Sequence, residues 1–472
     1  MKKIIVIMAV LAIAGAANAA TEQQKQAAID AGLAWLADTQ TESGSEGYWS
    51  YTNSGTLATT GSAALAFIEE GYLPGSDVII DTGSGPVNYG DVVGRATNYI
   101  FNRATAVTMT GQTMGHPEDY NNDGTGDGNS QGIYFNPGDS NRNVYTTGIV
   151  APVVYALGEA LGRTTVVGAG VDLDGDSSTP DVGGFAPTSG VAGGMTYEGV
   201  MQDVIDWYSW GQVDPAYGNH RGGWRYNANY TTSDNSTAQW GALPMLYGDG
   251  WDLTPPQFVK DELNLYADYI QNTEGAGSWR NGGSGYDTPS HYVNMAKTGG
   301  LMLELAAIGA PVTDPRVQAA LGYMQSTVSF DHWNQPTYTY YSGTSDQWWG
   351  GHLNNPYAMW AVYKALETYG ITTISTAPGG FTIGQEWDPG TSAAGDWYAQ
   401  YCDYLVGIQN GNGSWSGSGP FAGALATGWY INILNATGVP EPVDPVPVPG
   451  AFLLGSLGLA FSGWKIRRRK EA

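Results

Sequence analysis

Residues 269–279 read YIQNTEGAGSW, and residues 408–415 read IQNGNGSW. In both stretches a Gln-Asn pair follows an isoleucine and leads, within a few residues, to Gly-Ser-Trp. Looser versions run from Gln40 to Trp49, through Gly-Tyr-Trp, and over residues 222–226, which read GGWRY. A loop that recurs along a chain in this way indicates one structural unit used several times.

A helical hairpin is expected around each loop. The helix before the loop has an apolar stripe at helical spacing, as in Val259, Leu263 and Tyr266. The helix after it is rich in small residues nearly all round, which is typical of burial between neighbours. These second helices are expected near residues 55–71, 143–161, 234–247, 291–308, 355–369 and 420–437, with Asp234 as an N-cap. They are expected to end near Gly71, Gly162, Gly248, Gly309, Gly370 and Gly438, as capping glycines would.

Six such hairpins can close into a ring, so that no repeat leaves an apolar face bare. The Gln and Gly-Ser-Trp loops resemble the repeats of squalene–hopene cyclases and of the β subunits of protein prenyltransferases. The resemblance covers roughly residues 22–438. It implies an all-α fold, an (α/α)6 toroid of six hairpins, over residues 20–438. It also implies that certain side chains tie adjacent repeats together, namely Gln271, Trp279, Gln409 and Trp415.

The chemistry of those two families is not matched by this sequence. Class II cyclases use an Asp-x-Asp-Asp acid, and the chain has none. Prenyltransferases hold zinc with an Asp-x-Cys pair and a later His, whereas Gln400 stands two residues before Cys402 and no His follows it. A terpene cyclase or prenyltransferase-like enzyme is therefore the least favoured function.

The two ends of the chain carry address signals. Residues 1–19 contain Lys2 and Lys3, an apolar run and the small-x-small site Ala17–Ala19, which together predict a secretory signal peptide. Residues 439–472 contain a Pro-rich linker, an apolar segment of fifteen residues up to Trp464 and a basic tail. Fifteen helical residues rise about 22 Å, short of a ~30 Å hydrocarbon core.

This C-terminal layout resembles the PEP-CTERM sorting signal of Gram-negative bacteria. The resemblance implies an exosortase-type partner, transient membrane insertion of the tail, and delivery to the periplasm, outer envelope, cell surface or extracellular matrix. It also implies an exopolysaccharide or biofilm setting. The alternative is a plain C-terminal membrane anchor.

The charge and the cysteine content of the chain limit which partners and cross-links are expected. The formal charge is −25, and removal of both end signals leaves 12 basic and 43 acidic residues, or −31. Such a surface repels phosphate backbones, so nucleic acid is not an expected partner. The single cysteine, Cys402, excludes an internal disulfide framework and is expected to pack as a small apolar residue.

One loop resembles the first half of an EF-hand. Oxygen ligands stand at its first, third, fifth and ninth positions, which are Asp119, Asn121, Asp123 and Asp127, and glycine at the sixth. The twelfth position is Ser130 instead of the bidentate Glu, so weak calcium binding is expected. The alternative is an ordinary Asp/Asn/Gly turn.

Polar residues in the loops are the candidate catalytic groups, and the alternative role for each is a helix cap or a loop hydrogen bond. The candidates are His220, Arg221, Asp287, His291, Tyr292, Asp346 and His352. Polysaccharide lyases on α/α barrels resemble this set in using His, Tyr, Asn and Arg. An aromatic-rich loop over residues 338–349 could stack on sugars or fill a core.

Two functions from different classes follow. The favoured one is a non-catalytic binding or structural role at the cell surface or in the exopolysaccharide matrix. The alternative is a polysaccharide-active enzyme, a lyase or hydrolase, that uses the toroid cavity.

Overall fold

The computed structural model describes residues 20–51, 55–138, 142–172, 181–275, 278, 280–324, 352–353, 355–374, 396–418 and 420–439. The fold is helix-rich, as the sequence predicts. One set of helices comprises α1 (Glu22–Thr39), α3 (Tyr89–Phe101), α5 (Tyr197–Gly211), α7 (Gln257–Ile270), α9 (Pro315–Met324) and α11 (Trp397–Ile408). The alternating set comprises α2 (Thr56–Glu69), α4 (Asn143–Leu161), α6 (Asn235–Asp249), α8 (Met295–Ala307), α10 (Pro356–Thr368) and α12 (Ala424–Leu434).

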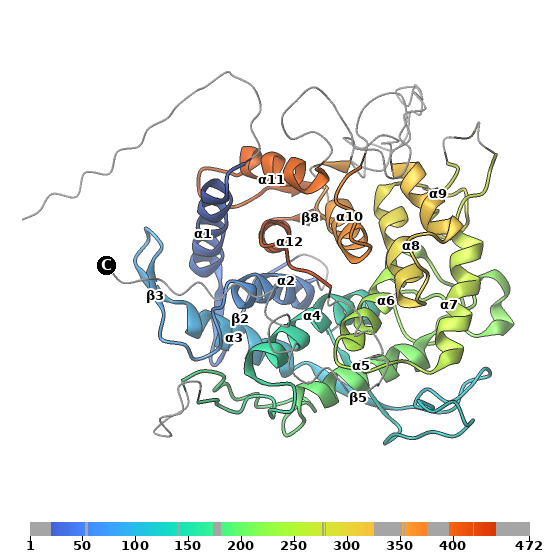
Figure 1. Ribbon diagram of the computed structural model, residues 1–472. Helices are drawn as coiled ribbons and strands as arrows, with labels where there is room; N and C mark the ends of the chain where they lie inside the picture. Colours follow the sequence, from blue (N-terminus) through green and yellow to red (C-terminus); the bar gives the residue numbers. More distant parts are fainter. Residues whose placement is uncertain are drawn as a thin grey trace, which may run out of the picture.

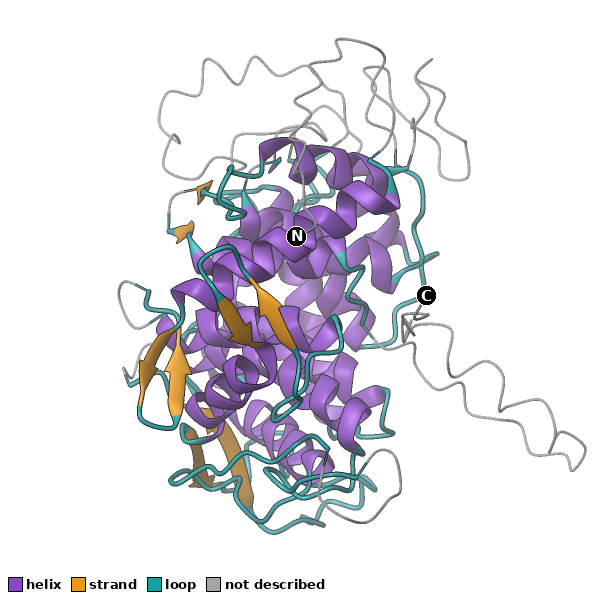
Figure 2. Ribbon diagram, turned by 90° about the vertical axis from the view of Figure 1, so that its left-hand side faces the viewer, coloured by secondary structure: helices purple, strands orange, loops and turns teal. Residues whose placement is uncertain are grey.

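Strands in the described part of the chain form only short antiparallel pairs. They are β1 (Thr41–Ser43) with β2 (Glu46–Tyr48), β3 (Ile79–Asp81) with β4 (Pro86–Asn88), β5 (Ala104–Thr108) with β6 (Gln131–Phe135), and β7 (Gly417–Ser418) with β8 (Phe421–Ala422). These pairs lie at the outside of the helical body (Figure 2). A short 3-10 helix, η1 (Pro215–His220), precedes α6.

The even-numbered helices form the centre of the molecule. Each packs on the next along the chain, from α2 through α4, α6, α8 and α10 to α12, and α12 packs back on α2. The odd-numbered helices lie around them at the periphery (Figure 1). Burial follows the same division: α2 is buried continuously from Leu57 to Ile68, whereas α7 buries one stripe that includes Val259 and Leu263. The small residues of the central helices permit this close packing on several sides.

The helix starts agree with the capping chemistry in the sequence. Polar side chains accept hydrogen bonds from backbone N–H groups in the first turn, which would otherwise lack partners. Asp234 caps α6 as predicted, through the N–H of Ser236 at 3.0 Å. The other caps of this type are Thr21, Asn88, Thr196, Asn294, Asn355 and Asp396.

The predicted capping glycines are correct in four of six places. Gly71, Gly162, Gly309 and Gly370 have positive φ angles next to the ends of α2, α4, α8 and α10. α6 also ends near its predicted glycine, but Gly248 is its penultimate residue and not its cap; Gly438 lies four residues beyond the last residue of α12, Leu434.

Two of the predicted helix ranges are too long. α12 lies between Gly423 and Ala436, whose φ angles of +62° and +53° cannot be part of a right-handed helix. α8 begins at Met295 instead of 291, because Asn294 caps it and a backbone bond from Tyr286 N to the oxygen of His291 holds the preceding loop.

The recurring glutamines tie hairpins to their neighbours. Gln271 Nε2 donates to the carbonyl oxygens of Gly282 in its own loop and Arg316 in α9, at 3.0 and 2.9 Å. Gln409 Nε2 does the same to Gly413 and to Ala28 in α1, at 2.8 and 2.7 Å. The Gln409 bond therefore joins the last hairpin to the first.

The tryptophan of the repeated loop makes a second hydrogen bond that recurs along the chain. The indole N–H of Trp415 donates to Leu405 O at 2.8 Å, and Trp49 and Trp224 make the equivalent bond within their own hairpins. The predicted role of Gln271 and Gln409 as ties between repeats is confirmed, whereas the hydrogen bond of Trp415 holds its own hairpin together. Trp279 lies outside the described residues.

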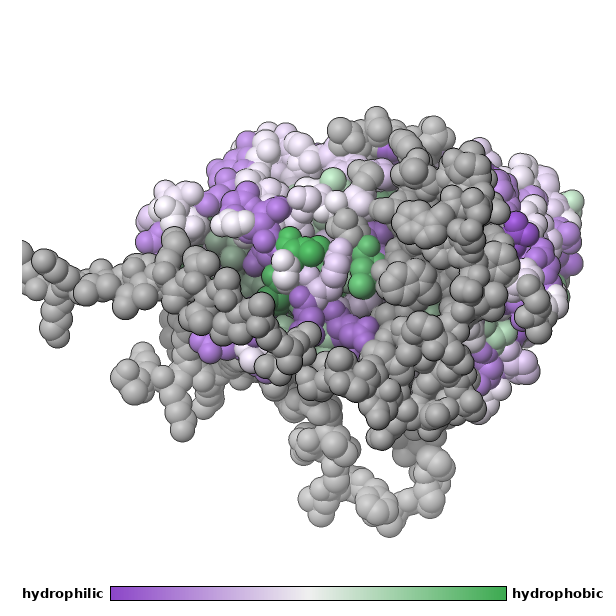
Figure 3. Space-filling view, turned by 90° about the horizontal axis from the view of Figure 1, so that it is seen from above, coloured by the Kyte–Doolittle hydropathy of each residue, from purple (hydrophilic) through white to green (hydrophobic). Residues whose placement is uncertain are grey.

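Within the described part of the chain, α4 is the one helix long and apolar enough to cross a membrane, and 72% of its apolar window is buried inside the protein. That burial is typical of a core helix. Cys402 is also buried, on α11, and burial raises the pKa of its thiol to about 12. Figure 3 shows the face on the side of α11, where hydrophobic residues gather in a hollow beside hydrophilic ones.

Candidate functional site

Two neighbouring loops carry most of the candidate residues. Residues 212–234 connect α5 to α6, and residues 271–294 connect α7 to α8. The phenol oxygens of Tyr226 and Tyr286, one from each loop, lie 3.0 Å apart. The backbone N–H of Asn235 donates to Tyr286 O at 2.7 Å. The two loops therefore form one continuous surface at the N-terminal ends of α6 and α8.

Three candidate residues lie together on this surface. His291 Nδ1 is 2.5 Å from Asp287 Oδ1, and the ring of Tyr292 lies 4.0 Å, centroid to centroid, from that of His291. Tyr286 makes edge contacts with both rings. Tyr292 is 42% exposed and has a φ of +50°, which is rare for an aromatic residue. Its ring is thus presented to solvent.

Arg225 extends this cluster along the first loop. Its guanidinium carbon lies 5.6 Å from the ring centroid of Tyr226 and 5.8 Å from that of Tyr230. The guanidinium donates to Thr232 Oγ1 at 3.0 Å and lies 3.7 Å from the buried carboxylate of Asp234. We name the whole set the tyrosine-rich surface; it comprises Arg225, Tyr226, Tyr230, Tyr286, Asp287, His291 and Tyr292.

A lysine lies beneath the tyrosine-rich surface. Lys297 is on α8, is 8% exposed, and its amine lies 5.8 Å from the ring centroid of Tyr286. Burial lowers the pKa of Lys297 to about 8, although the negative charge of Asp234 acts in the opposite direction.

The other described candidate residues are held by hydrogen bonds to neighbouring parts of the fold. Arg221 makes a two-bond ion pair with Glu262 on α7, both distances being 2.6 Å, which raises the pKa of Arg221. His220 Nδ1 accepts from the N–H of Ser233 at 3.2 Å. His352 is fully buried with its Nε2 against the hydroxyl of Tyr401, away from this surface. Asp346 and residues 338–349 lie outside the described residues.

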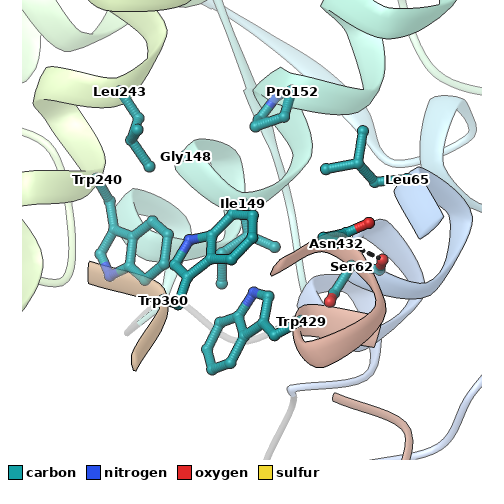
Figure 4. A pocket seen from close by; sticks show the side chains of 10 residues that line it. All are labelled: Ser62, Leu65, Gly148, Ile149, Pro152, Trp240, Leu243, Trp360, Trp429 and Asn432. Carbon is teal, nitrogen blue, oxygen red and sulfur yellow. Dashed lines mark hydrogen bonds between the residues drawn. The ribbon is translucent and has the colours of Figure 1, made fainter. Parts of the chain in front are cut away.

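The centre of the even-numbered helices is filled by indoles (Figure 4). The ring of Trp429 lies nearly parallel to those of Trp240 and Trp360, at centroid distances of 6.2 and 6.1 Å. The hollow beside them is no more than about 220 Å³, below the ~300 Å³ that ligand pockets usually reach. Within the described residues, the buried Ser62 Oγ, Trp360 Nε1 and Asn432 Oδ1 line this hollow and have no hydrogen-bond partner, but the packed indoles leave no room for a substrate.

Tyr357 extends this indole stack toward the first turn of α6. Its hydroxyl donates to Ser236 O at 2.9 Å, and its ring packs on Phe421 and Trp240.

The EF-hand-like loop is held by its own side chains. Asp119 accepts from the N–H groups of Asp123 and Gly124, and Asp127 accepts from those of Tyr120 and Asn121. Among the described residues, no group of three His, Cys, Asp or Glu side chains is placed to hold a metal ion. Calcium binding by this loop stays a prediction, and a calcium titration of the melting temperature tests it. An unchanged melting temperature at millimolar calcium would leave these residues as turn formers.

Four residues in or beneath the tyrosine-rich surface are not among the candidates that the sequence predicts. Arg225 and Tyr226 belong to the repeated loop motif of residues 222–226, and Tyr230 belongs to no motif. Lys297 could have been found, because a lone lysine in a helix of small and apolar residues is unusual.

No protein-family model matches this chain, and no curated protein matches it. The function is therefore inferred from the chain's own residues.

Proposed function

We propose that the helical part of the chain is an (α/α)6 toroid of six hairpins. The closed series of contacts among the even-numbered helices supports this proposal. The bond from Gln409 to Ala28 supports it independently, because it joins the last hairpin to the first by the same tie that links the earlier ones.

The toroid is proposed to be exported and then sorted at the envelope of a Gram-negative bacterium by an exosortase-type enzyme. The signal peptide (1–19) and the sorting tail lie outside the described residues, except for Val439. Support comes from the first helix, which starts immediately after the predicted cleavage site. Thr21 and Gln24 form a reciprocal capping box there.

The proposed activity is non-catalytic binding of a glycan by the tyrosine-rich surface. The observation that carries it is the Tyr226–Tyr286 pair, which joins two loops into one exposed aromatic face. Tyrosines supply broad apolar contact with a hydrogen-bonding hydroxyl and lose little conformational entropy on binding. The strongly acidic composition favours a neutral glycan over an anionic one.

A polysaccharide-active enzyme is the second candidate. The contact between Asp287 and His291 favours it, because a carboxylate that orients an imidazole beside a tyrosine is a common acid–base arrangement. Two observations weigh against it. Arg221 is held by Glu262, and the toroid centre is filled by Trp240, Trp360 and Trp429. A terpene cyclase or prenyltransferase is disfavoured by the same filled centre and the missing motifs.

Incubation of the purified protein with its host's exopolysaccharide distinguishes the two. We expect retention of the polymer without chain shortening. The substitutions Tyr230→Ala and Tyr292→Ala are expected to weaken retention at least tenfold, because both rings are exposed. Tyr217→Ala is the matched control, since Tyr217 is equally exposed but makes none of these ring contacts. Shortened chains that disappear in a His291→Ala variant would establish the enzyme instead.

A further inference from the structure

A second, separate cavity lies where the last hairpin meets the first. It is about 540 Å³ in volume and lies between α1, the turn of the β3–β4 hairpin and the loop after α11. This size is within the range of small-molecule sites, roughly 300–1,000 Å³. We name it the seam groove; it is lined by Ala31, Ala34, Trp35, Asp38, Thr82, Ser84, Gly411, Asn412 and Gly413.

The three walls of the seam groove are fixed to one another. Gln409 Nε2 donates to Ala28 O, which holds the loop on α1. Gly413 has a φ of +89°, and a Cβ there would lie 2.1 Å from Ala31 O, so only glycine permits this approach. Thr82 Oγ1 donates to Asp38 Oδ1 at 2.6 Å, which holds the hairpin turn on the same helix. The groove is therefore preformed.

The side chains in the seam groove have complementary chemistry. Trp35 packs on the core and remains half-buried, so it presents a flat apolar wall. Asp38 is exposed and supplies carboxylate oxygens as acceptors. Asn412 is also exposed; its side-chain oxygen accepts from Ser414, which directs the amide NH₂ group elsewhere as a donor. The remaining positions are small: Ala31, Ala34, Gly411 and Gly413 leave the space open, and Thr82 and Ser84 carry hydroxyl groups.

This combination matches a neutral pyranose ring. A sugar ring has an apolar C–H face, which can lie on an indole, and hydroxyl groups at its rim, which pair with carboxylate and amide side chains. Among the described residues, none of those that line the groove is basic, and Asp38 would repel a carboxylated or sulfated sugar.

We propose that the seam groove binds one neutral pyranose unit, with Trp35 as the stacking wall and Asp38 and Asn412 as hydrogen-bonding partners. This extends the proposed glycan-binding function by a second site, and it stands on residues that the tyrosine-rich surface does not share. Two separate sites on one rigid body would raise the avidity for a polymeric glycan.

The test is titration of the full-length protein with methyl glucoside, methyl galactoside, methyl mannoside and methyl glucuronide, followed by saturation-transfer NMR. We expect at least one neutral glycoside to bind saturably, and the glucuronide to bind at least tenfold more weakly. Trp35→Ala and Asn412→Ala should each weaken binding at least tenfold, while Trp35→Phe should stay within about threefold of wild type because it keeps an aromatic wall. Asn412 is on an exposed loop, so Asn412→Ala still tests the groove if Trp35→Ala fails to fold.

Tyr292→Ala separates this proposal from the preceding one. It should leave the glycoside titration unchanged, even if it abolishes retention of the exopolysaccharide. Absence of saturable binding by every neutral glycoside, or equal binding by wild type and both alanine variants of the groove, would overturn the proposal. Loss of glycoside binding in Tyr292→Ala alone would place the sugar on the tyrosine-rich surface instead.

Discussion

At the scale of single residues, Asp206 illustrates how burial sets charge. It is on α5 and 1% exposed; Tyr120 Oη donates to its Oδ2 at 2.7 Å and Gln202 Nε2 to its Oδ1 at 2.8 Å. These bonds favour the ionised form, yet burial outweighs them and raises the pKa of Asp206 to about 8. Asp203 nearby has its pKa raised to about 7, also mainly by burial. Both carboxyl groups hold protons at pH values where ordinary aspartates have lost them.

This sets the direction of a pH effect on stability. The unfolded chain releases the proton of Asp206 near its ordinary pKa of 3.8, whereas the folded protein keeps it up to about pH 8. Between these two pH values the folded state therefore binds more protons than the unfolded state. The stability that Asp206 contributes falls as the pH rises through this interval. Asp206→Asn should flatten that fall and raise stability at pH 8 by on the order of 1–2 kcal/mol.

Melting temperatures between pH 5 and 9 at constant ionic strength check this prediction. Asp261→Asn, on the exposed face of α7, is the control and should follow the wild-type curve. An Asp206→Asn curve parallel to wild type would show that the carboxyl group is ionised throughout.

At the scale of elements, the joints between hairpins depend on glycine. Gly222, Gly282 and Gly413 all have positive φ, and each meets a backbone carbonyl of the next peripheral helix where a Cβ would be. Each follows the glutamine tie of its own loop, so a tight turn and a hydrogen bond act at the same place. The glutamine and the later glycine of each of these loops therefore act together in the contact between hairpins, although the number of residues between them differs.

Gly413→Ala tests this joint. The methyl group would lie 2.1 Å from Ala31 O in a backbone conformation unfavourable to alanine, so a loss of about 2–4 kcal/mol is expected. Gly411→Ala is the matched control, because nothing lies within 4 Å of its Cβ position and its φ is not positive; its effect should stay within about 0.5 kcal/mol. Urea unfolding measures both, and equal stability of the two variants would contradict the role assigned to Gly413.

At the scale of the whole molecule, the described fold ends against its own core. The carbonyl of Gly438 accepts from Tyr247 Oη at 3.1 Å, that of Thr437 accepts from Tyr363 Oη at 3.0 Å, and the N–H of Val439 donates to Glu367 at 2.9 Å. These bonds fix the C-terminal end of the described helical body.

Processing of the chain is the prediction at this scale. Material released from the producing cells should begin near Ala20 and should lack the segment after about Pro449, since the described helical body begins at Ala20 and ends at Val439. Intact-mass measurement of the released protein checks this. A mass that includes residues 464–472 would favour a plain membrane anchor over a sorting signal.

Sequence patterns predicted none of the four short strand pairs in the described part of the chain, but they did predict the order of the paired helices. Local chemistry suffices there: Asp234 caps the helix that follows it, small residues fill α2, and Gln409 with Trp415 marks a repeated loop. The ends of α8 and α12 were less predictable, because contacts of the neighbouring loops set them. Only the tertiary structure brought Tyr226 to Tyr286 and Trp35 to Asn412. Those residues are far apart in the chain and follow no periodic pattern, and their proximity depends on how the hairpins pack against one another.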